Sequence, residues 1–306
     1  MRLLLFILLL GWPALAQETP VFKTGTAWVR VDVQVGEKER VLRDLQQRDF
    51  VVYDEGEPQK ILYFGHDTEP LDVLLLLDVS GSMRRYLEQM AANARTALDQ
   101  LHEGDRVAIM GFSRTSKVEE EFTPDHQKAA AGLRDAVHEG GLGSGTRIVA
   151  AIVAAARYIQ GASVEAKGRR AVLILTDNES MEYQMPNEKA VDALLAADTV
   201  LNAIVVGRGE RDKPPKPGQY VNPDFTKSDV FRIADETGGE AVRANRADAS
   251  FRDMMESIRT RYSIQYAAPE SAVAGSFRRI RVDLSPEARK KYPRAWIRAR
   301  SGYVVK

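Results

Sequence analysis

The sequence predicts an α/β fold: a doubly wound, mostly parallel sheet flanked by a small β module made of N- and C-terminal strands. Three observations predict it. A continuous apolar run of strand length covers residues 73–77, strand-like and helix-like segments alternate from there to about residue 244, and WVRVDVQV at residues 28–35 alternates apolar and polar side chains. The 306 residues are enough for one sizeable α/β core and a smaller second module.

The α/β part is expected to consist of apolar strands with helices between them. Strands are predicted at 73–77, 106–112, 170–175, 200–206 and 240–242, with a short antiparallel edge strand at 117–122. Helices are predicted at 84–102, 126–138, 147–160, 187–197, 228–237 and 249–260. In the last helix Phe251, Met254, Met255 and Ile258 recur at helical spacing, so its methionines are predicted to lie in the core.

The β module is predicted from the two ends of the chain. In WVRVDVQV the valines are expected to face the core, and Arg30, Asp32 and Gln34 to face solvent. Two β-rich runs around DEGEP indicate a hairpin or tight loop, and strand patterns return at 262–267, 277–284 and 296–305. We therefore expect an α/β domain inserted between two halves of one β module. The expected boundaries are 17–68 and 261–306 for the two halves and 69–260 for the inserted domain.

The first 16 residues have the pattern of a secretory signal peptide. Arg2 precedes an apolar stretch at residues 3–10, and a glycine, a proline and the run ALA follow, so cleavage is expected after Ala16. The alternative is a membrane anchor, but about eight apolar residues cannot cross roughly 30 Å of hydrocarbon as a helix. The sequence therefore predicts a periplasmic or secreted protein without a transmembrane segment once the signal is removed.

Composition excludes several classes of function. The chain contains no cysteine, which removes disulfides, thiolate nucleophiles and zinc-thiolate sites, and which suits an exported bacterial protein. Lysine plus arginine and aspartate plus glutamate both number 43, so no overall charge favours nucleic acid or an anionic membrane. Residues 276–306 are locally basic. Alternating arginines are typical of the solvent face of a strand, and binding of an anionic glycan or lipid surface is the alternative.

Polar side chains gather where the predicted topology places the carboxyl edge of the sheet. Asp78, Ser80 and Ser82 follow the first apolar strand, Thr146 closes GGLGSGT before a helix, and Asp177 ends RRAVLILTD. Hydroxyls and carboxylates without histidine or cysteine are hard oxygen ligands, suited to Mg²⁺, with Mn²⁺ and Ca²⁺ as alternatives, and poorly suited to Zn²⁺. The alternative for either serine is a plain helix N-cap.

The segments DVSGS, GSGT and LILTD resemble the three parts of the metal-ion-dependent adhesion site of von Willebrand factor A domains. The resemblance covers about residues 71–260, and the wider layout is similar to a bacterial exported VWFA-related family of acidobacterial type. It implies that Ser80 and Ser82 ligate the ion directly and that Thr146 does so directly or through water. It implies that Asp78 and Asp177 act mostly through water and hydrogen bonds.

This ligand set predicts a function. An ion whose nearest protein ligands are neutral hydroxyls stays electrophilic, and its open position is best filled by an anionic oxygen such as an Asp or Glu carboxylate of a partner protein. We therefore expect an exported, metal-dependent protein-binding or adhesion module that helix movement around Thr146 can gate. Two insertions follow the strands on this edge; their apolar residues are predicted to contact the partner or, alternatively, to fold onto the domain surface: Met181, Tyr183, Met185, Tyr220 and Phe225.

Two rival functions also fit parts of the sequence. In the first, the protein is a periplasmic scaffold whose ion only braces the loops. In the second, it is a Mg²⁺-dependent phosphatase of the haloacid dehalogenase type, which needs a second carboxylate two residues after the nucleophilic aspartate, where this chain has Ser80. GGLGSGT lacks the ending of a phosphate-binding P-loop, and the four histidines have no metal spacing. The chain is therefore expected not to be an enzyme.

Overall fold

The computed structural model describes residues 28–38, 40–66, 69–138, 142–162, 168–213, 216 and 219–305. The predicted signal peptide, residues 1–16, lies outside the described residues. At the centre is a six-stranded sheet in the order β13-β11-β9-β6-β7-β8. Its strands are β6 (Leu71–Asp78), β7 (Arg106–Phe112), β8 (Ser116–Thr123), β9 (Arg169–Thr176), β11 (Val200–Val206) and β13 (Ala241–Ala244). All pair in parallel except the edge strand β8, so the predicted fold class is confirmed.

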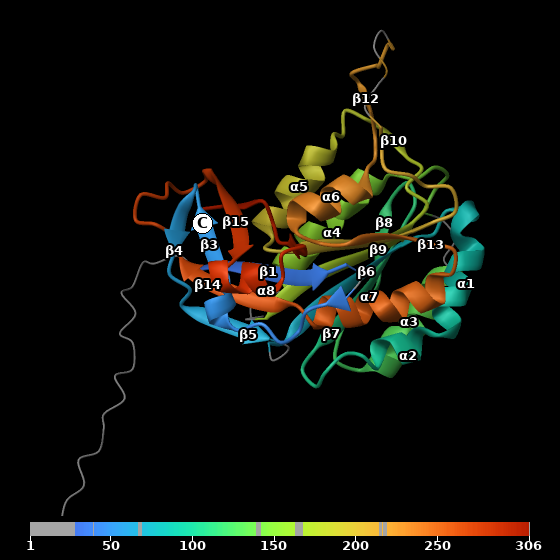
Figure 1. Ribbon diagram of the computed structural model, residues 1–306. Helices are drawn as coiled ribbons and strands as arrows, with labels where there is room; N and C mark the ends of the chain where they lie inside the picture. Colours follow the sequence, from blue (N-terminus) through green and yellow to red (C-terminus); the bar gives the residue numbers. More distant parts are fainter. Residues whose placement is uncertain are drawn as a thin grey trace, which may run out of the picture.

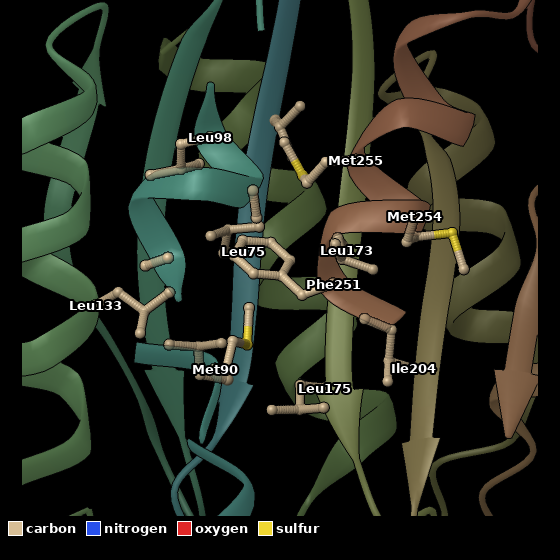
Figure 2. Close-up of a cluster of buried hydrophobic side chains, with 14 of the residues drawn as sticks. Leu75, Met90, Leu98, Leu133, Leu173, Leu175, Ile204, Phe251, Met254 and Met255 are labelled. Carbon is tan, nitrogen blue, oxygen red and sulfur yellow. The ribbon is translucent and has the colours of Figure 1, made fainter. Parts of the chain in front are cut away.

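Helices cover both faces of this sheet and give three layers (Figure 1). One layer contains α1 (Arg84–Ala92), α2 (Ala94–Leu98), α3 (His126–His138) and α7 (Ala247–Arg259), and the other contains α4 (Ile148–Ala162), α5 (Asn187–Ala196) and α6 (Val230–Thr237). The run of apolar residues in β6 follows from this, because Leu75 packs under the first layer and Leu74 and Leu76 under the second. Figure 2 shows Phe251 and Met255 of α7 beside Leu75 and Leu173, as predicted for core residues.

Strands from the two ends of the chain form a β sandwich of two antiparallel sheets. One sheet has the order β16-β1-β14-β5 with β2 beside β1, and the other has the order β17-β15-β3-β4. Their bounds are β1 (Trp28–Glu37), β2 (Arg40–Val41), β3 (Phe50–Asp54), β4 (Glu57–Gln59), β5 (Tyr63–His66), β14 (Tyr262–Ala267), β15 (Phe277–Leu284), β16 (Ala295–Arg298) and β17 (Gly302–Val304). Strands from the two ends of the chain pair directly, β1 with β14 and β3 with β15, around one apolar core.

The second face of β1 is buried, so the prediction that Asp32 and Gln34 face solvent is wrong. This face packs on the α/β domain, where Asp32 Oδ2 accepts a hydrogen bond from Arg169 Nε at 3.1 Å and Gln34 Nε2 donates to Ser257 Oγ at 2.7 Å. Arg169, only 2% exposed, also donates to two carbonyls at the C-terminal end of α7, at 2.6 and 2.9 Å. One arginine therefore joins the sandwich, the sheet and α7.

Two further predictions of single elements are wrong. The helix predicted at 84–102 is two helices, because the backbone leaves helical geometry at Asn93 (φ −116°, ψ 11°). The strand predicted at 296–305 is divided into β16 and β17, which pair in different sheets, and between them Arg300 donates to Asp198 at 2.6 Å. Helix α8 (Pro286–Lys291), the short 3₁₀ helices Gln47–Asp49 and Gly81–Met83, and a hairpin of β10 (Met181–Tyr183) with β12 (Phe225–Lys227) were not predicted.

The order of the strands places a crevice at one edge of the sheet. After β6 the chain continues to β7 on one side, and it later reaches β9 on the other side, so the carboxyl ends of β6 and β9 form a topological switch point. The sandwich is connected to the opposite, amino edge through β5 and β14 (Figure 1). Among the described helices, none has the length and apolar character needed to cross a membrane.

Candidate metal centre

Asp78 is the most deeply buried member of the candidate site. It ends β6 and is 0% exposed, and its Oδ1 accepts from the Ser80 backbone N–H at 3.1 Å while Oδ2 accepts from Thr176 Oγ1 at 2.9 Å. Burial raises the pKa of Asp78 to about 6, although the hydrogen bonds from Ser80 and Thr176 oppose this rise. Because burial disfavours the charged carboxylate, a cation close to it would be stabilising.

Three more predicted residues converge beside Asp78. Ser80 Oγ lies 3.3 Å from Ser82 Oγ, and Ser82 Oγ donates to Asp177 Oδ2 at 2.7 Å. Ser80 stands at the N-cap position of the 3₁₀ helix Gly81–Met83, but its side chain makes no capping hydrogen bond, and α1 is preceded by Met83. The capping alternative therefore does not account for these hydroxyls, which point to one another and to a carboxylate.

Thr146 is held next to this cluster through its backbone. Its carbonyl accepts from Ser180 Oγ at 2.7 Å, and Ser180 lies three residues after Asp177. The preceding loop bends at two glycines with positive φ, and Ser113 Oγ lies 2.9 and 2.7 Å from their carbonyl oxygens. The structure thus brings four predicted residues into direct contact and connects the fifth through Ser180.

The Asp177 loop is fixed by the segment that follows β11. Asn178 has a positive φ of 56°; its amide donates to the Glu210 carbonyl at 3.0 Å, and its Oδ1 accepts from the Val230 N–H at 3.2 Å. Gly209 packs against the same loop so closely that a Cβ there would lie 2.0 Å from the Asp177 carbonyl oxygen. Only glycine fits at this crossing, so the position of Asp177 depends on a distant part of the chain.

The oxygen set fits a hard divalent cation. No described ion pair joins Asp78 or Asp177 to lysine or arginine, so neither carboxylate is already neutralised in the part of the chain that the structure describes. Within those residues no group of three or more His, Cys, Asp or Glu side chains has metal-binding geometry. The oxygens available to a cation here are those of the Ser80 and Ser82 hydroxyls and the Asp78 and Asp177 carboxylates, with Thr146 on the neighbouring loop.

The antiparallel pair of β10 and β12 stands beside the site and projects from the body of the molecule (Figure 1). We call this pair the hairpin, although α5 and β11 lie between its two strands in the sequence. Its inner face carries Glu182, 2% exposed, which caps α4: Oε1 accepts from the Val149 N–H at 2.6 Å and Oε2 from the Ala150 N–H at 3.3 Å. Burial raises the pKa of Glu182, and the Arg147 guanidinium 3.7 Å away opposes this. The hairpin is therefore attached to the helix that begins two residues after Thr146.

Four of the five residues predicted to contact a partner are exposed around this hairpin. Met181, Tyr183 and Phe225 lie on the face opposite Glu182, where the rings of Tyr183 and Phe225 meet edge to face at 5.4 Å, and Tyr220 is 82% exposed in the loop before β12. Met185 differs, because it is partly buried against the layer of α4, α5 and α6. Its side chain therefore offers less surface than the other four.

Sequence reasoning missed three residues that organise the site: Thr176, Ser180 and Glu182. Thr176 stands next to the motif aspartate, but its contact with Asp78 depends on the parallel register of β6 and β9. Glu182 carried a signal, since a lone acidic residue between two apolar ones in MEY predicts a strand with opposite faces. Its partner, the N-terminus of α4, could not be inferred without the fold.

An open hollow of about 360 Å³ lies between the Thr146 loop and the hairpin. Arg114 and Arg147 line one side, and Met181, Tyr183 and Phe225 line the other. Thr146 itself lines this hollow, so one of the five predicted metal ligands and the hairpin border the same space.

The fold and the crevice define a doubly wound α/β domain with an oxygen-lined site at its switch point. Residues 73–179 match the sequence profile of the von Willebrand factor type A domain. Residues 73–179 therefore belong to a von Willebrand factor type A domain, in accordance with the motifs found in the sequence. No curated protein matches the chain.

Solved structures with a similar fold include three bacterial proteins. BatB from Bacteroides thetaiotaomicron is 21% identical, with a TM-score of 0.44, and the match covers 61% of this chain and 97% of that one. An aerotolerance-related membrane protein from Bacteroides fragilis is 20% identical, with a TM-score of 0.43 and coverage of 60% and 96%. A von Willebrand factor type A protein from Catenulispora acidiphila is 13% identical, with a TM-score of 0.45 and coverage of 93% and 76%.

Proposed function

We propose that this protein is an exported, divalent-metal-dependent protein-binding module. Mg²⁺, with Mn²⁺ and Ca²⁺ as alternatives, is held at Asp78, Ser80, Ser82, Thr146 and Asp177 and captures an Asp or Glu side chain of a partner. The observation that carries the proposal is the convergence of Ser80, Ser82 and Asp177 within 3.3 Å contacts at the end of β6, above the buried Asp78. Neutral hydroxyls nearest to the ion leave it able to attract an anionic ligand.

The surface beside the site supports a protein as the ligand. Half of the ten large apolar side chains that are exposed in the described residues lie on the hairpin and its loop: Met181, Tyr183, Tyr220, Val221 and Phe225. Exposed apolar groups that gather in one place, next to polar ones, are typical of protein contact surfaces. A small anion would not use this area.

The proposal includes no catalytic role. Position 80 holds a serine where the phosphatase mechanism requires a general acid, so the residues around Asp78 do not supply that reaction. If the protein showed phosphatase activity and the Asp78→Asn variant lost it, the phosphatase alternative would be supported instead.

Calorimetric titration with Mg²⁺ tests the metal site. The wild-type protein is expected to bind one ion, and the double variant Ser80→Ala, Ser82→Ala to lose measurable binding, while Ser271→Ala, at an exposed turn, keeps it. Bound metal also stabilises the native state, by about 2.7 kcal/mol at a free concentration of 100 times Kd. Unfolding by urea that is unchanged by Mg²⁺ up to 10 mM, together with a flat titration, would contradict the site.

Affinity capture from the source organism's envelope tests the function. Partners should be retained with Mg²⁺, released by chelator, and absent from the double serine variant. Retention under all three conditions would instead favour a scaffold whose ion only braces the loops. Mass spectrometry of the mature N-terminus checks export, with cleavage expected after Ala16.

A further inference from the structure

We propose that the hollow between the Thr146 loop and the hairpin is a second subsite, which binds a second carboxylate and an adjacent apolar side chain of the same partner segment. This inference rests on the proposed function, because the first carboxylate of that segment is taken by the metal. It assigns the chemistry of the partner: an extended stretch of polypeptide with two acidic residues and an aromatic or aliphatic residue near the second one.

The hollow adjoins the loop that carries Thr146, one of the predicted metal ligands. The Thr146 carbonyl accepts a hydrogen bond from Ser180, which lies three residues after Asp177 and immediately before β10. β10 then forms the opposite wall of the hollow, and Met181, Glu182 and Tyr183 are all among its lining residues. A chain segment that leaves the ion in this direction meets the hollow next.

The wall of the hollow on the side of the Thr146 loop is positively charged. Arg114 is exposed and lines the hollow. Its aliphatic stem packs over Gly143, where an added Cβ would lie 3.0 Å from the Arg114 Cβ. Its guanidinium makes no ion pair with any of the described residues. Arg147 is 3.7 Å from Glu182, but that carboxylate is buried and already accepts two backbone hydrogen bonds from α4. Glu182 is the acidic residue in this lining, so the accessible charge is that of two guanidinium groups, which suit a carboxylate.

The far wall is apolar and preorganised. Met181, Tyr183 and Phe225 are 65%, 56% and 42% exposed, and Tyr183 is paired with Phe225 in the strand register as well as by its ring. Because Glu182 fixes this hairpin to α4, little ordering is required on binding. An apolar side chain placed here would be partly desolvated between the rings and Met181, which is the setting in which aromatic residues contribute most to binding.

Synthetic fluorescent peptides of about ten residues in a Gly/Ser background test the inference by anisotropy, in Mg²⁺ and in chelator. The first peptide has one Asp, the second adds a Phe, and a third set adds a second Asp at a separation of one to four residues. At the best separation the two-acid peptide with Phe is expected to bind at least tenfold more tightly than the one-acid peptide. A lysine in place of the second Asp should abolish this gain.

The ratio between the two affinities, measured within each variant, isolates the hollow from the metal site. Arg114→Ala should bring the ratio down severalfold, Arg114→Glu should bring it to one or below, and Tyr183→Ser should remove the contribution of Phe. Arg252→Ala, at an exposed arginine of α7, should leave the ratio as it is. Glu182→Gln offers an independent check, since loosening the hairpin should lower the contribution of Phe more than that of the second Asp.

The outcomes separate the two proposals. If no peptide shows binding that depends on Mg²⁺, the proposed function and the subsite both fall. If the one-acid peptide binds with Mg²⁺ but the second Asp and the Phe add nothing, or if their gain survives in Arg114→Glu and Tyr183→Ser, the subsite alone is refuted.

Discussion

Asp54 is expected to be the side chain on which the β sandwich depends most. It ends β3 and is 0% exposed. Its Oδ2 accepts from the hydroxyls of Tyr266 and Tyr303, both at 2.9 Å, and its Oδ1 accepts from Arg278 Nε at 2.7 Å. One carboxylate therefore satisfies three donors from three different strands of the C-terminal half, and it comes from the N-terminal half.

The perturbation is Asp54→Asn, which preserves volume but removes the charge. Hydrogen bonds to a charged group contribute about 1.5–3 kcal/mol each, and breaking a buried ion pair by removing one partner costs about 3–5 kcal/mol. Asparagine still offers one oxygen to the tyrosines, but its amide would face the Arg278 guanidinium, which cannot accept a hydrogen bond. We therefore expect the free energy of unfolding to fall by about 3–5 kcal/mol.

Urea unfolding of the mature chain, followed by tryptophan fluorescence, measures this loss. Trp28 and Trp296 both lie in the sandwich, on β1 and β16, so their emission reports on the region that Asp54 stabilises. Asp253→Asn, whose carboxylate is 66% exposed, serves as the matched control and should change stability by less than about 0.5 kcal/mol. A loss below about 1 kcal/mol in Asp54→Asn would refute the reasoning.

Three further expectations follow from other contacts. Burial raises the pKa of Tyr303 from 10.0 to about 12, so the stability that its neutral ring contributes is complete below pH 10 and is lost as the pH rises through 12; urea midpoints should fall over this window, and less so in Tyr303→Phe. Arg169→Lys should lower the free energy of unfolding by roughly 2–4 kcal/mol, because lysine cannot bridge a carboxylate and two carbonyls at once; a change under about 1 kcal/mol in urea unfolding would contradict this. Gly209→Ala should displace the Asp177 loop and weaken calorimetric Mg²⁺ affinity by roughly tenfold or more, whereas Gly161→Ala, at a position with open space around it, should not; equal affinities in both would argue against the loop's role.

The central sheet could be predicted from the sequence because its strands are buried on both faces. Residues 73–77 are apolar throughout since alternate side chains enter different helix layers, and such a run identifies a central parallel strand without further information. The polar residues that follow β6 and β9 could then be placed at one edge. The proximity of Ser82 to Asp177 follows from that topology alone.

Contacts between segments that are far apart in the sequence could not be predicted from local sequence patterns. The alternation in β1 identifies two faces but cannot say that the polar one is covered by the α/β domain, where Asp32 meets Arg169. The pairing of β10 with β12 joins three-residue strands separated by more than forty residues, and neither strand is long enough to have a period. The way Thr146 joins the cluster, through its carbonyl and Ser180, depends on backbone positions that no motif encodes.

The attachment of the sandwich at the amino edge has a mechanical consequence. A partner held at the carboxyl edge and an anchor on the sandwich would pull on the α/β domain from its two ends, nearly along the direction of β6 and β9. The backbone bonds that join these strands to their neighbours, from Leu71 through Asp78, run across that direction and would share the load in shear instead of opening one after another. The domain is thus oriented to transmit tension without unzipping its sheet.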